Sequence, residues 1–214
     1  DLDRFESSAP DRTDARLALG LDPHRQLAVY TGSLKAHKGI GTLLDAARLS
    51  PETAFLLVGG GEEQIAGWKA RAGDIPNLSF VPFVANAELP RYLAAADVCL
   101  VPNSRSDRTA GWTFSLKLFE YLAAHRAVVA SAIPSLTTIV RDGDNGLLVP
   151  PDDPAALAAA LRRLRAEPGL ARRLAEKGHE TASRHTWDGR AELVLERLLP
   201  ALLAATLLQG CGAL

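Results

Sequence analysis

The chain contains 214 residues, of which 47% are hydrophobic and 23% charged, so it can bury a full core and is not intrinsically disordered. Lysine plus arginine number 24 and aspartate plus glutamate 25, which excludes the strongly basic surface that nucleic acid or an anionic membrane would attract. We therefore expect no nucleic-acid partner, and any anion-binding site must be local.

The two cysteines, Cys99 and Cys211, are too few for a metal cluster and give no reason to expect a disulfide. The first residues lack the basic start and apolar stretch of a secretory signal. The apolar stretch from Leu193 to Leu208 is interrupted by charges and by Pro200, which argues against a membrane-spanning helix. We expect a cytoplasmic protein. The chain has no methionine, so either an initiator residue has been removed or, as we expect, the chain is a piece of a longer one.

Short apolar runs alternate with helical patterns along the chain, as is typical of stacked βαβ units. Strands are predicted at residues 27–31, 54–58, 78–81, 98–101, 127–130 and 146–149. Helices are predicted at residues 39–49, 62–71, 87–95, 114–124, 135–141, 153–165, 169–184 and 187–207. We expect an α/β fold with a Rossmann-like, doubly wound, six-stranded parallel sheet and extra C-terminal helices. Residues 1–26 would form a lead-in, 27–186 the Rossmann-like domain, and 187–214 a C-terminal helix and tail.

Ligands of such sheets bind at the carboxyl ends of the strands, so the loops after the strands are the candidate sites. In the first loop, Gly32 would let the backbone approach a ligand, and Lys38 would place a positive charge beside a helix N-terminus. These features suit a phosphate group. Taken alone, the loop fits a tight turn with a solvated lysine better than it fits a phosphate site.

The second loop, from Gly59 to Gly61, resembles a dinucleotide-binding fingerprint only in part. Gln64 stands where that fingerprint needs a small residue, and the loop follows the second strand, so an NAD-dependent oxidoreductase is a poor fit. We expect a tight turn near a ligand, with Glu62 or Glu63 at the helix N-terminus. A purely structural turn remains the alternative.

The fourth loop and the helix after it carry the strongest local signal. If the helix begins near Phe114, the free amides of Phe114, Ser115 and Leu116 can hold a diphosphate. Glu120 lies one turn further on and leans back toward the helix start, where it can accept hydrogen bonds from a ribose diol. The alternative is an acid on an ordinary helix, but a glutamate among apolar neighbours needs a partner.

Several segments in this order and spacing resemble the retaining glycosyltransferases of family 4, the glycosyl transferases group 1, which have the GT-B fold. The matching segments are Tyr30 to Gly39, Val58 to Glu62, Ala95 to Val98, Pro102 to Ser104, Ser115 to Tyr121, Ala127 to Ser131 and Asp142 to Pro150. The resemblance implies that the chain is the C-terminal, donor-nucleotide-binding half of a two-domain enzyme. Its first residues resemble the end of the interdomain linker, and the N-terminal acceptor domain would be a separate partner.

The resemblance also assigns roles to individual residues. Lys38 matches the lysine that neutralises the diphosphate, which makes it the expected catalytic residue because charge grows on the leaving phosphate. Glu120 matches the acid that binds ribose. Backbone from Phe83 to Asn86 would contact the base. The donor-nucleotide set so implied is Gly32, Ser33, Lys38, Phe83, Thr113, Phe114, Ser115, Leu116 and Glu120.

The chain departs from the family pattern at two positions of this site. Ser33 stands where the family usually has arginine, and Trp112 stands where it has the first of two paired glutamates. A family subset with a Ser-Leu-Lys-Leu-Phe-Glu-like helix start, which this chain resembles, also lacks that first acid. The cationic clamp is therefore incomplete, and Lys35, Arg105 or Arg108 could complete it.

The intact protein is expected to move a hexosyl unit from a nucleoside-diphosphate sugar to a glycan, lipid or small-molecule acceptor, and this chain alone to be inactive. A nucleotide-sugar-binding module without transfer is the main alternative, and a GT-B nucleotide-sugar epimerase fits less well. No metal or cofactor is expected, because Asp142 and Asp144 belong to a turn before a strand. Lipid-linked acceptors would bring the intact enzyme to the inner face of the membrane, and two chains can dimerise through the apolar C-terminal helix.

Overall fold

The computed structural model describes residues 2–6, 10–106 and 115–210 and contains one open sheet. The sheet has six strands in the order β3-β2-β1-β4-β5-β6, and every pair is parallel. The strands are β1 (Gln26–Thr31), β2 (Thr53–Val58), β3 (Leu78–Val81), β4 (Val98–Val101), β5 (Ala127–Ser131) and β6 (Leu147–Val149). The order reverses between β1 and β4, so the two halves of the sheet wind outward from this pair. The expected α/β class and doubly wound parallel sheet are confirmed.

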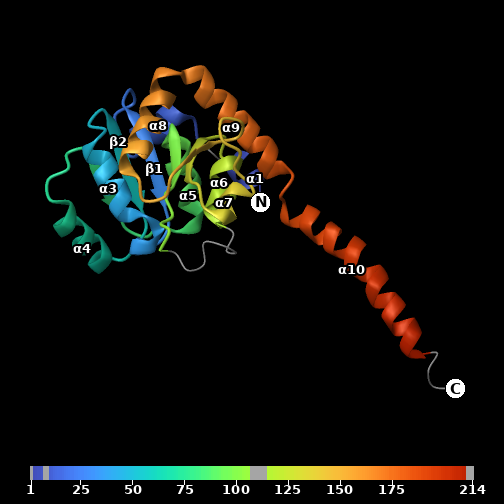
Figure 1. Ribbon diagram of the computed structural model, residues 1–214. Helices are drawn as coiled ribbons and strands as arrows, with labels where there is room; N and C mark the ends of the chain where they lie inside the picture. Colours follow the sequence, from blue (N-terminus) through green and yellow to red (C-terminus); the bar gives the residue numbers. More distant parts are fainter. Residues whose placement is uncertain (1, 7–9, 107–114, 211–214) are drawn as a thin grey trace.

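Helices cover both faces of the sheet (Figure 1). The α-helices are α1 (Asp3–Glu6), α2 (Arg12–Ala18), α3 (Ile40–Arg48), α4 (Glu62–Ala72), α5 (Leu89–Ala95), α6 (Leu116–Ala123), α7 (Pro134–Thr137), α8 (Pro154–Ala166), α9 (Pro168–Ser183) and α10 (Trp187–Gly210). Two 3-10 turns, η1 (Ala36–Lys38) and η2 (Asn86–Glu88), precede α3 and α5.

Alternate residues of each strand enter two separate cores, because successive side chains of a strand point to opposite faces. Leu27 and Val29 of β1 pack with α5 and α6, whereas Ala28 and Tyr30 pack with α3 and α8. Parallel sheets covered on both faces read as nearly continuous apolar runs, and this is why the strands were predictable from sequence.

All eight predicted helices differ from the structure in at least one bound, and two of these differences have a local cause. The helix predicted from residue 114 begins at Leu116, because Ser115 is an extended N-cap residue. The helix predicted at 135–141 ends at Thr137. Its continuation is prevented by Asn145, whose side chain accepts a hydrogen bond from the amide of Arg141 at 2.7 Å and donates one to the carbonyl of Ile139 at 2.9 Å. These backbone groups would otherwise extend the helix.

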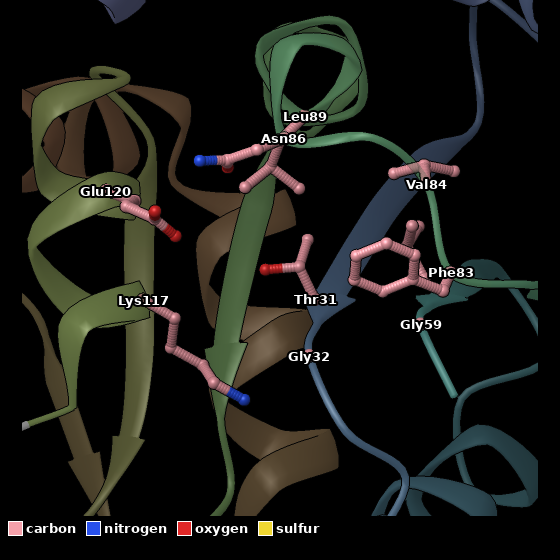
Figure 2. A pocket seen from close by; sticks show the side chains of 10 residues that line it. Thr31, Gly32, Gly59, Phe83, Val84, Asn86, Leu89, Lys117 and Glu120 are labelled. Carbon is pink, nitrogen blue, oxygen red and sulfur yellow. The ribbon is translucent and has the colours of Figure 1, made fainter. Parts of the chain in front are cut away.

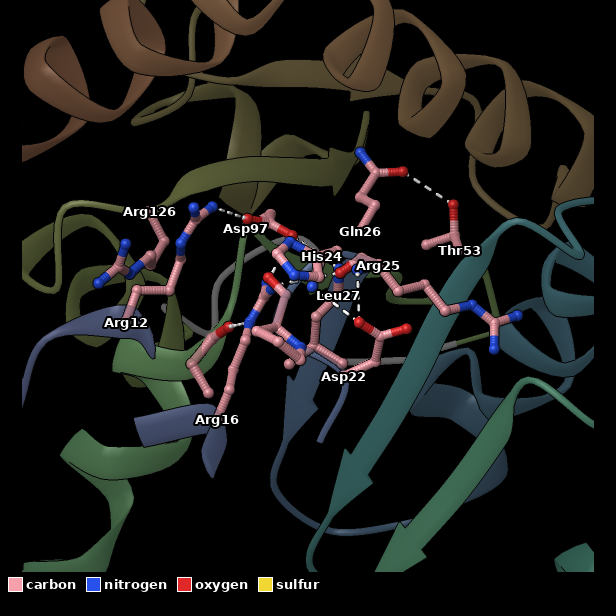
Figure 3. A network of polar contacts seen from close by, with 12 residues as sticks. Arg12, Arg16, Asp22, His24, Arg25, Gln26, Leu27, Thr53, Asp97 and Arg126 are labelled. Carbon is pink, nitrogen blue, oxygen red and sulfur yellow. Dashed lines mark hydrogen bonds and ion pairs between the residues drawn. The ribbon is translucent and has the colours of Figure 1, made fainter. Parts of the chain in front are cut away.

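A polar network at the amino ends of β1 and β4 joins α2 to the sheet (Figure 3). Arg16 of α2 is 1% exposed, and its guanidinium donates to the carbonyl of Ala95 at 2.8 Å and to Asp97 at 2.6 Å. Asp97 also accepts a hydrogen bond from the amide of Leu27 at 2.8 Å. A buried guanidinium is tolerated only with such partners, so this network holds the end of the sheet opposite the candidate site.

Helix α10 extends away from the rest of the domain (Figure 1). It runs without interruption past Pro200, and apolar side chains of its first half are about half exposed, among them Leu193 at 48% and Leu195 at 56%. In the part of the chain that the structure describes, no helix is long and apolar enough to cross a membrane.

Candidate functional site

A hollow of about 230 Å³ lies where the strand order reverses, at the carboxyl ends of β1 and β2 (Figure 2). This is the position where ligands bind in open α/β sheets. Strand ends, the segment after β3 and one face of α6 form its walls. The lining residues are Thr31, Gly32, Val58, Gly59, Phe83, Val84, Asn86, Leu89, Lys117 and Glu120.

The hollow opens because β1 and β4 separate toward their carboxyl ends. The register pairs β1 with β2 along six residues but pairs β1 with β4 only through Ala28 and Val29. The amide of Thr31, beyond that pairing, donates instead to the hydroxyl of Tyr121 at 2.7 Å. Tyr121 is fully buried, so this bond satisfies a backbone donor that has left the ladder and fixes α6 against the end of β1.

Backbone rather than side chains forms the floor of the hollow. Gly32 and Gly59 have φ angles of 127° and 130°, a region that favours glycine. A Cβ atom on Gly59 would stand 2.1 Å from the carbonyl oxygen of Gly32, so the two strand ends can approach this closely only without a side chain at position 59. Gly32, which is exposed, therefore leaves its backbone accessible to a ligand.

Lys117 extends from the first turn of α6 across the hollow toward Gly32 (Figure 2). Its ammonium nitrogen lies 2.8 Å from the position that a Cβ of Gly32 would take and 3.9 Å from the centroid of the Tyr30 ring. Burial, together with the positive charge of Lys38, lowers the pKa of Lys117 to about 7, and the negative charge of Glu120 opposes the shift. The site therefore contains an ammonium group whose charge changes near neutral pH.

Glu120 lies three residues after Lys117, on the same side of α6, and its carboxylate points into the hollow (Figure 2). Partial burial raises its pKa, whereas the positive charges of Arg4 and Lys117 act in the opposite direction. Arg4 of α1 also hydrogen bonds to the side-chain oxygen of Asn86 at 2.6 Å and to its carbonyl. Helix α1 is thereby held beside the mouth of the site.

The loop after β1 packs against the loop after β4. Gly39 has a φ angle of 78°, and a Cβ there would stand 1.7 Å from the carbonyl oxygen of Pro102. The amide of Ser104 donates to the carbonyl of His37 at 3.1 Å. This packing holds Lys38, the last residue of η1, near α6, which agrees with the effect of its charge on Lys117.

The structure brings part of the predicted set into one place. Gly32, Phe83 and Glu120 line the hollow, and Phe83 is 80% exposed. Four predicted residues lie beside the hollow, in the β1 loop and at the start of α6, without lining it: Ser33, Lys38, Ser115 and Leu116. The remaining predicted residues, Thr113 and Phe114, lie outside the described residues, as do Trp112 and Arg108.

Lys117 is not among the site residues predicted from the sequence. A signal was present, because Lys117 lies within the Ser115 to Tyr121 segment, one helical turn before Glu120. A lysine on a helix is ordinarily a solvated charge, however, and only the packing of α6 on β1 turns this one inward.

The fold and the site together define a doubly wound α/β domain with a hollow at its switch point, the place between β1 and β4 where the strand order reverses. Domains of this class bind their ligands there. Residues 25–167, more than half of the chain, match the model of the family described as glycosyl transferases group 1. The chain belongs to this family.

The chain is similar to named enzymes and to solved structures, each of which is about twice as long. The D-inositol 3-phosphate glycosyltransferase of Streptomyces bingchenggensis is 32% identical over 205 residues, a match that covers 89% of this chain and 44% of that protein. Sucrose-phosphate synthase from Thermosynechococcus elongatus is 33% identical, with a TM-score of 0.78 over 94% of this chain and 51% of that one. Anabaena HepE in complex with UDP-glucose is 24% identical, with a TM-score of 0.73 over 86% of this chain and 50% of that one, and shows the same fold. The chain thus spans about half the length of these relatives.

Proposed function

We propose that the hollow binds the nucleoside diphosphate of a sugar donor and that the chain is the C-terminal, donor-binding half of a family 4 retaining glycosyltransferase. The observation that carries this proposal is the position of Glu120. Its carboxylate projects into the hollow at the switch point, above the floor formed by Gly32 and Gly59. A carboxylate has two acceptor oxygens and can accept hydrogen bonds from two neighbouring hydroxyl groups, as a ribose diol presents them.

In this proposal each wall of the hollow serves one part of the nucleotide. The ribose lies at Glu120, and the base lies against Phe83 and Val84 after β3, where the exposed aromatic ring is available for stacking. The diphosphate lies between the backbone of Gly32 and the start of α6, because free amides at a helix N-terminus and its dipole favour an anion. Lys38 adds positive charge from η1.

In the intact enzyme, the N-terminal domain would hold the acceptor, and a hexosyl unit would move to a glycan, lipid or small molecule. When the bond between sugar and phosphate breaks, its electron pair remains on the diphosphate. Fixed cations and amides beside that group stabilise the growing charge, and this is the catalytic role proposed for Lys38. We propose that side chains rather than a metal ion supply this charge, so the intact enzyme should retain its activity in the presence of EDTA.

The relatives support this proposal in two ways. Two of them are named for glycosyl transfer or for sugar-phosphate synthesis, and one of the same fold is a complex with UDP-glucose. A chain that spans 44% of one relative and 51% of another has the length expected for one of two domains.

Calorimetric titration of this chain with UDP, GDP and ADP tests the proposal. One nucleotide should bind, and Glu120→Gln should weaken its binding at least about tenfold, which is about 1.4 kcal/mol. The matched control is Glu63→Gln, because Glu63 is an exposed acid in the first turn of α4 that does not line the hollow. The absence of binding at millimolar nucleotide, or an equal loss in the control variant, would contradict the proposal.

A turnover assay of the intact enzyme separates the proposed transfer from its alternatives. Transfer releases the free nucleoside diphosphate and extends an acceptor. Nucleotide binding without turnover would indicate a binding module, and a nucleotide sugar of altered stereochemistry would indicate an epimerase.

A further inference from the structure

We propose that Lys117 is the second cation of the diphosphate site, so that the clamp consists of Lys38 and Lys117 and requires no arginine at position 33. This inference rests on the proposed function, because it names a residue that binds the phosphates of the donor. It concerns a side chain that lines the hollow and for which the family pattern gave no role.

Within the residues that the structure describes, the other side chains considered for this position are less suitable. Ser33 is exposed and uncharged, and its backbone carbonyl accepts a hydrogen bond from the hydroxyl of Tyr30 at 2.8 Å. Lys35 is exposed at the N-cap of η1, and Arg105 is exposed in the β4 loop, where its amide donates to Asp152 at 3.0 Å. Of these four side chains, only Lys117 lines the hollow.

The ammonium group of Lys117 also lies where a phosphate would need it. It sits above the backbone of Gly32, within 2.8 Å of the position of an added Cβ, and at the start of α6. A phosphate over Gly32 would therefore contact this cation, the glycine backbone and the first-turn amides of the helix together. With the lysine of α6 in this position, an arginine at position 33 is unnecessary.

The charges around Lys117 favour an anionic ligand. Tyr30 of β1 covers the ammonium group with its ring, and burial raises the pKa of that hydroxyl, so it stays neutral. Lys38 of η1 repels Lys117, and Glu120 on its own helix attracts it. The walls after β3 contribute uncharged Phe83, Val84 and Asn86. A partly buried ammonium with a like charge nearby is stabilised when a diphosphate enters.

This arrangement links binding to protonation. Because the pKa of Lys117 is lowered to about 7, a growing fraction of the free protein is neutral at this position as the pH rises above 7. A bound diphosphate favours the charged form, so the pKa of Lys117 is higher in the complex. Binding above pH 7 must then take up a proton, and affinity should fall by up to about tenfold per pH unit. The terminal phosphate of a free nucleoside diphosphate has lost its last proton by then, since such groups titrate near about pH 6.

The test measures nucleotide affinity and proton uptake for this chain between pH 7 and 9. Titrations with UDP, GDP and ADP in two buffers of different ionisation enthalpy give both quantities. Lys117→Gln should weaken binding about tenfold at pH 7 and abolish the proton uptake. Lys117→Arg should retain the affinity, because arginine stays charged, but should lose the pH dependence, which a merely structural lysine would not control.

Lys35→Gln and Lys177→Gln are the matched controls, because both lysines are exposed and lie outside the hollow. Both variants should behave as the wild type does. If nucleotide binds with a dependence on Glu120 but Lys117→Gln changes neither affinity nor proton uptake, this inference fails and the proposed function stands. If the wild-type chain binds none of the three nucleotides, both fail.

Discussion

Replacing Gly59 by alanine would test whether the floor of the hollow depends on the close approach of two strand ends. At a φ angle of 130°, a residue with a Cβ costs about 1–3 kcal/mol in backbone strain. The added atom would also stand 2.1 Å from the carbonyl oxygen of Gly32, and because that oxygen belongs to the backbone, the strand end itself must move. Overpacking of this kind costs a further ~1–3 kcal/mol, so the expected total loss is ~2–6 kcal/mol.

The assay is thermal unfolding followed by nucleotide titration. A domain of this size loses about 2–4 °C of Tm per kcal/mol, so Gly59→Ala should lower Tm by at least about 4 °C. Nucleotide affinity should fall as well, because the displaced Gly32 backbone is part of the floor. Gly61→Ala is the matched control: it lies two residues further on, has an ordinary φ angle of −84°, and its added Cβ would meet nothing within 4 Å. A Gly59→Ala chain that melts with the wild type, or a control that loses as much, would refute the reasoning.

Three further changes probe the contacts that hold the site in place. Tyr121→Phe removes the hydroxyl that satisfies the amide of Thr31, so it should lower the free energy of unfolding in urea by about 1–3 kcal/mol and weaken nucleotide binding. An unchanged affinity would show that this contact between α6 and β1 does not hold the site in place. Arg16→Ala leaves Asp97 without its buried partner and should lower the free energy of unfolding by about 3–5 kcal/mol in the same assay. Arg12→Ala removes the exposed partner of the same carboxylate and should cost less. Gly67→Ala, in the middle of α4 with open space around it, should raise stability by about 1 kcal/mol, and a loss would contradict the helix position.

Much of the fold could be predicted because its signals are local. The strands β3 and β4 have the predicted bounds, and the other four differ from them by one residue at one end. Buried parallel strands are apolar throughout, and turns interrupt them visibly. Helix ends were less predictable, because the end of α7 depends on Asn145, eight residues further along the chain, and the start of α6 depends on the conformation of Ser115.

The sequence alone determined that helices alternate with strands, that glycines follow β1 and β2, and that an acid lies one turn into the helix after β4. These properties depend on residue type and spacing along one segment. Only the tertiary structure decided that β1 and β4 separate, that Tyr121 satisfies the amide of Thr31, and that Lys117 lies over Gly32. A lysine can direct its long side chain either to solvent or inward, and the choice here follows from how α6 packs against a strand more than eighty residues earlier in the chain.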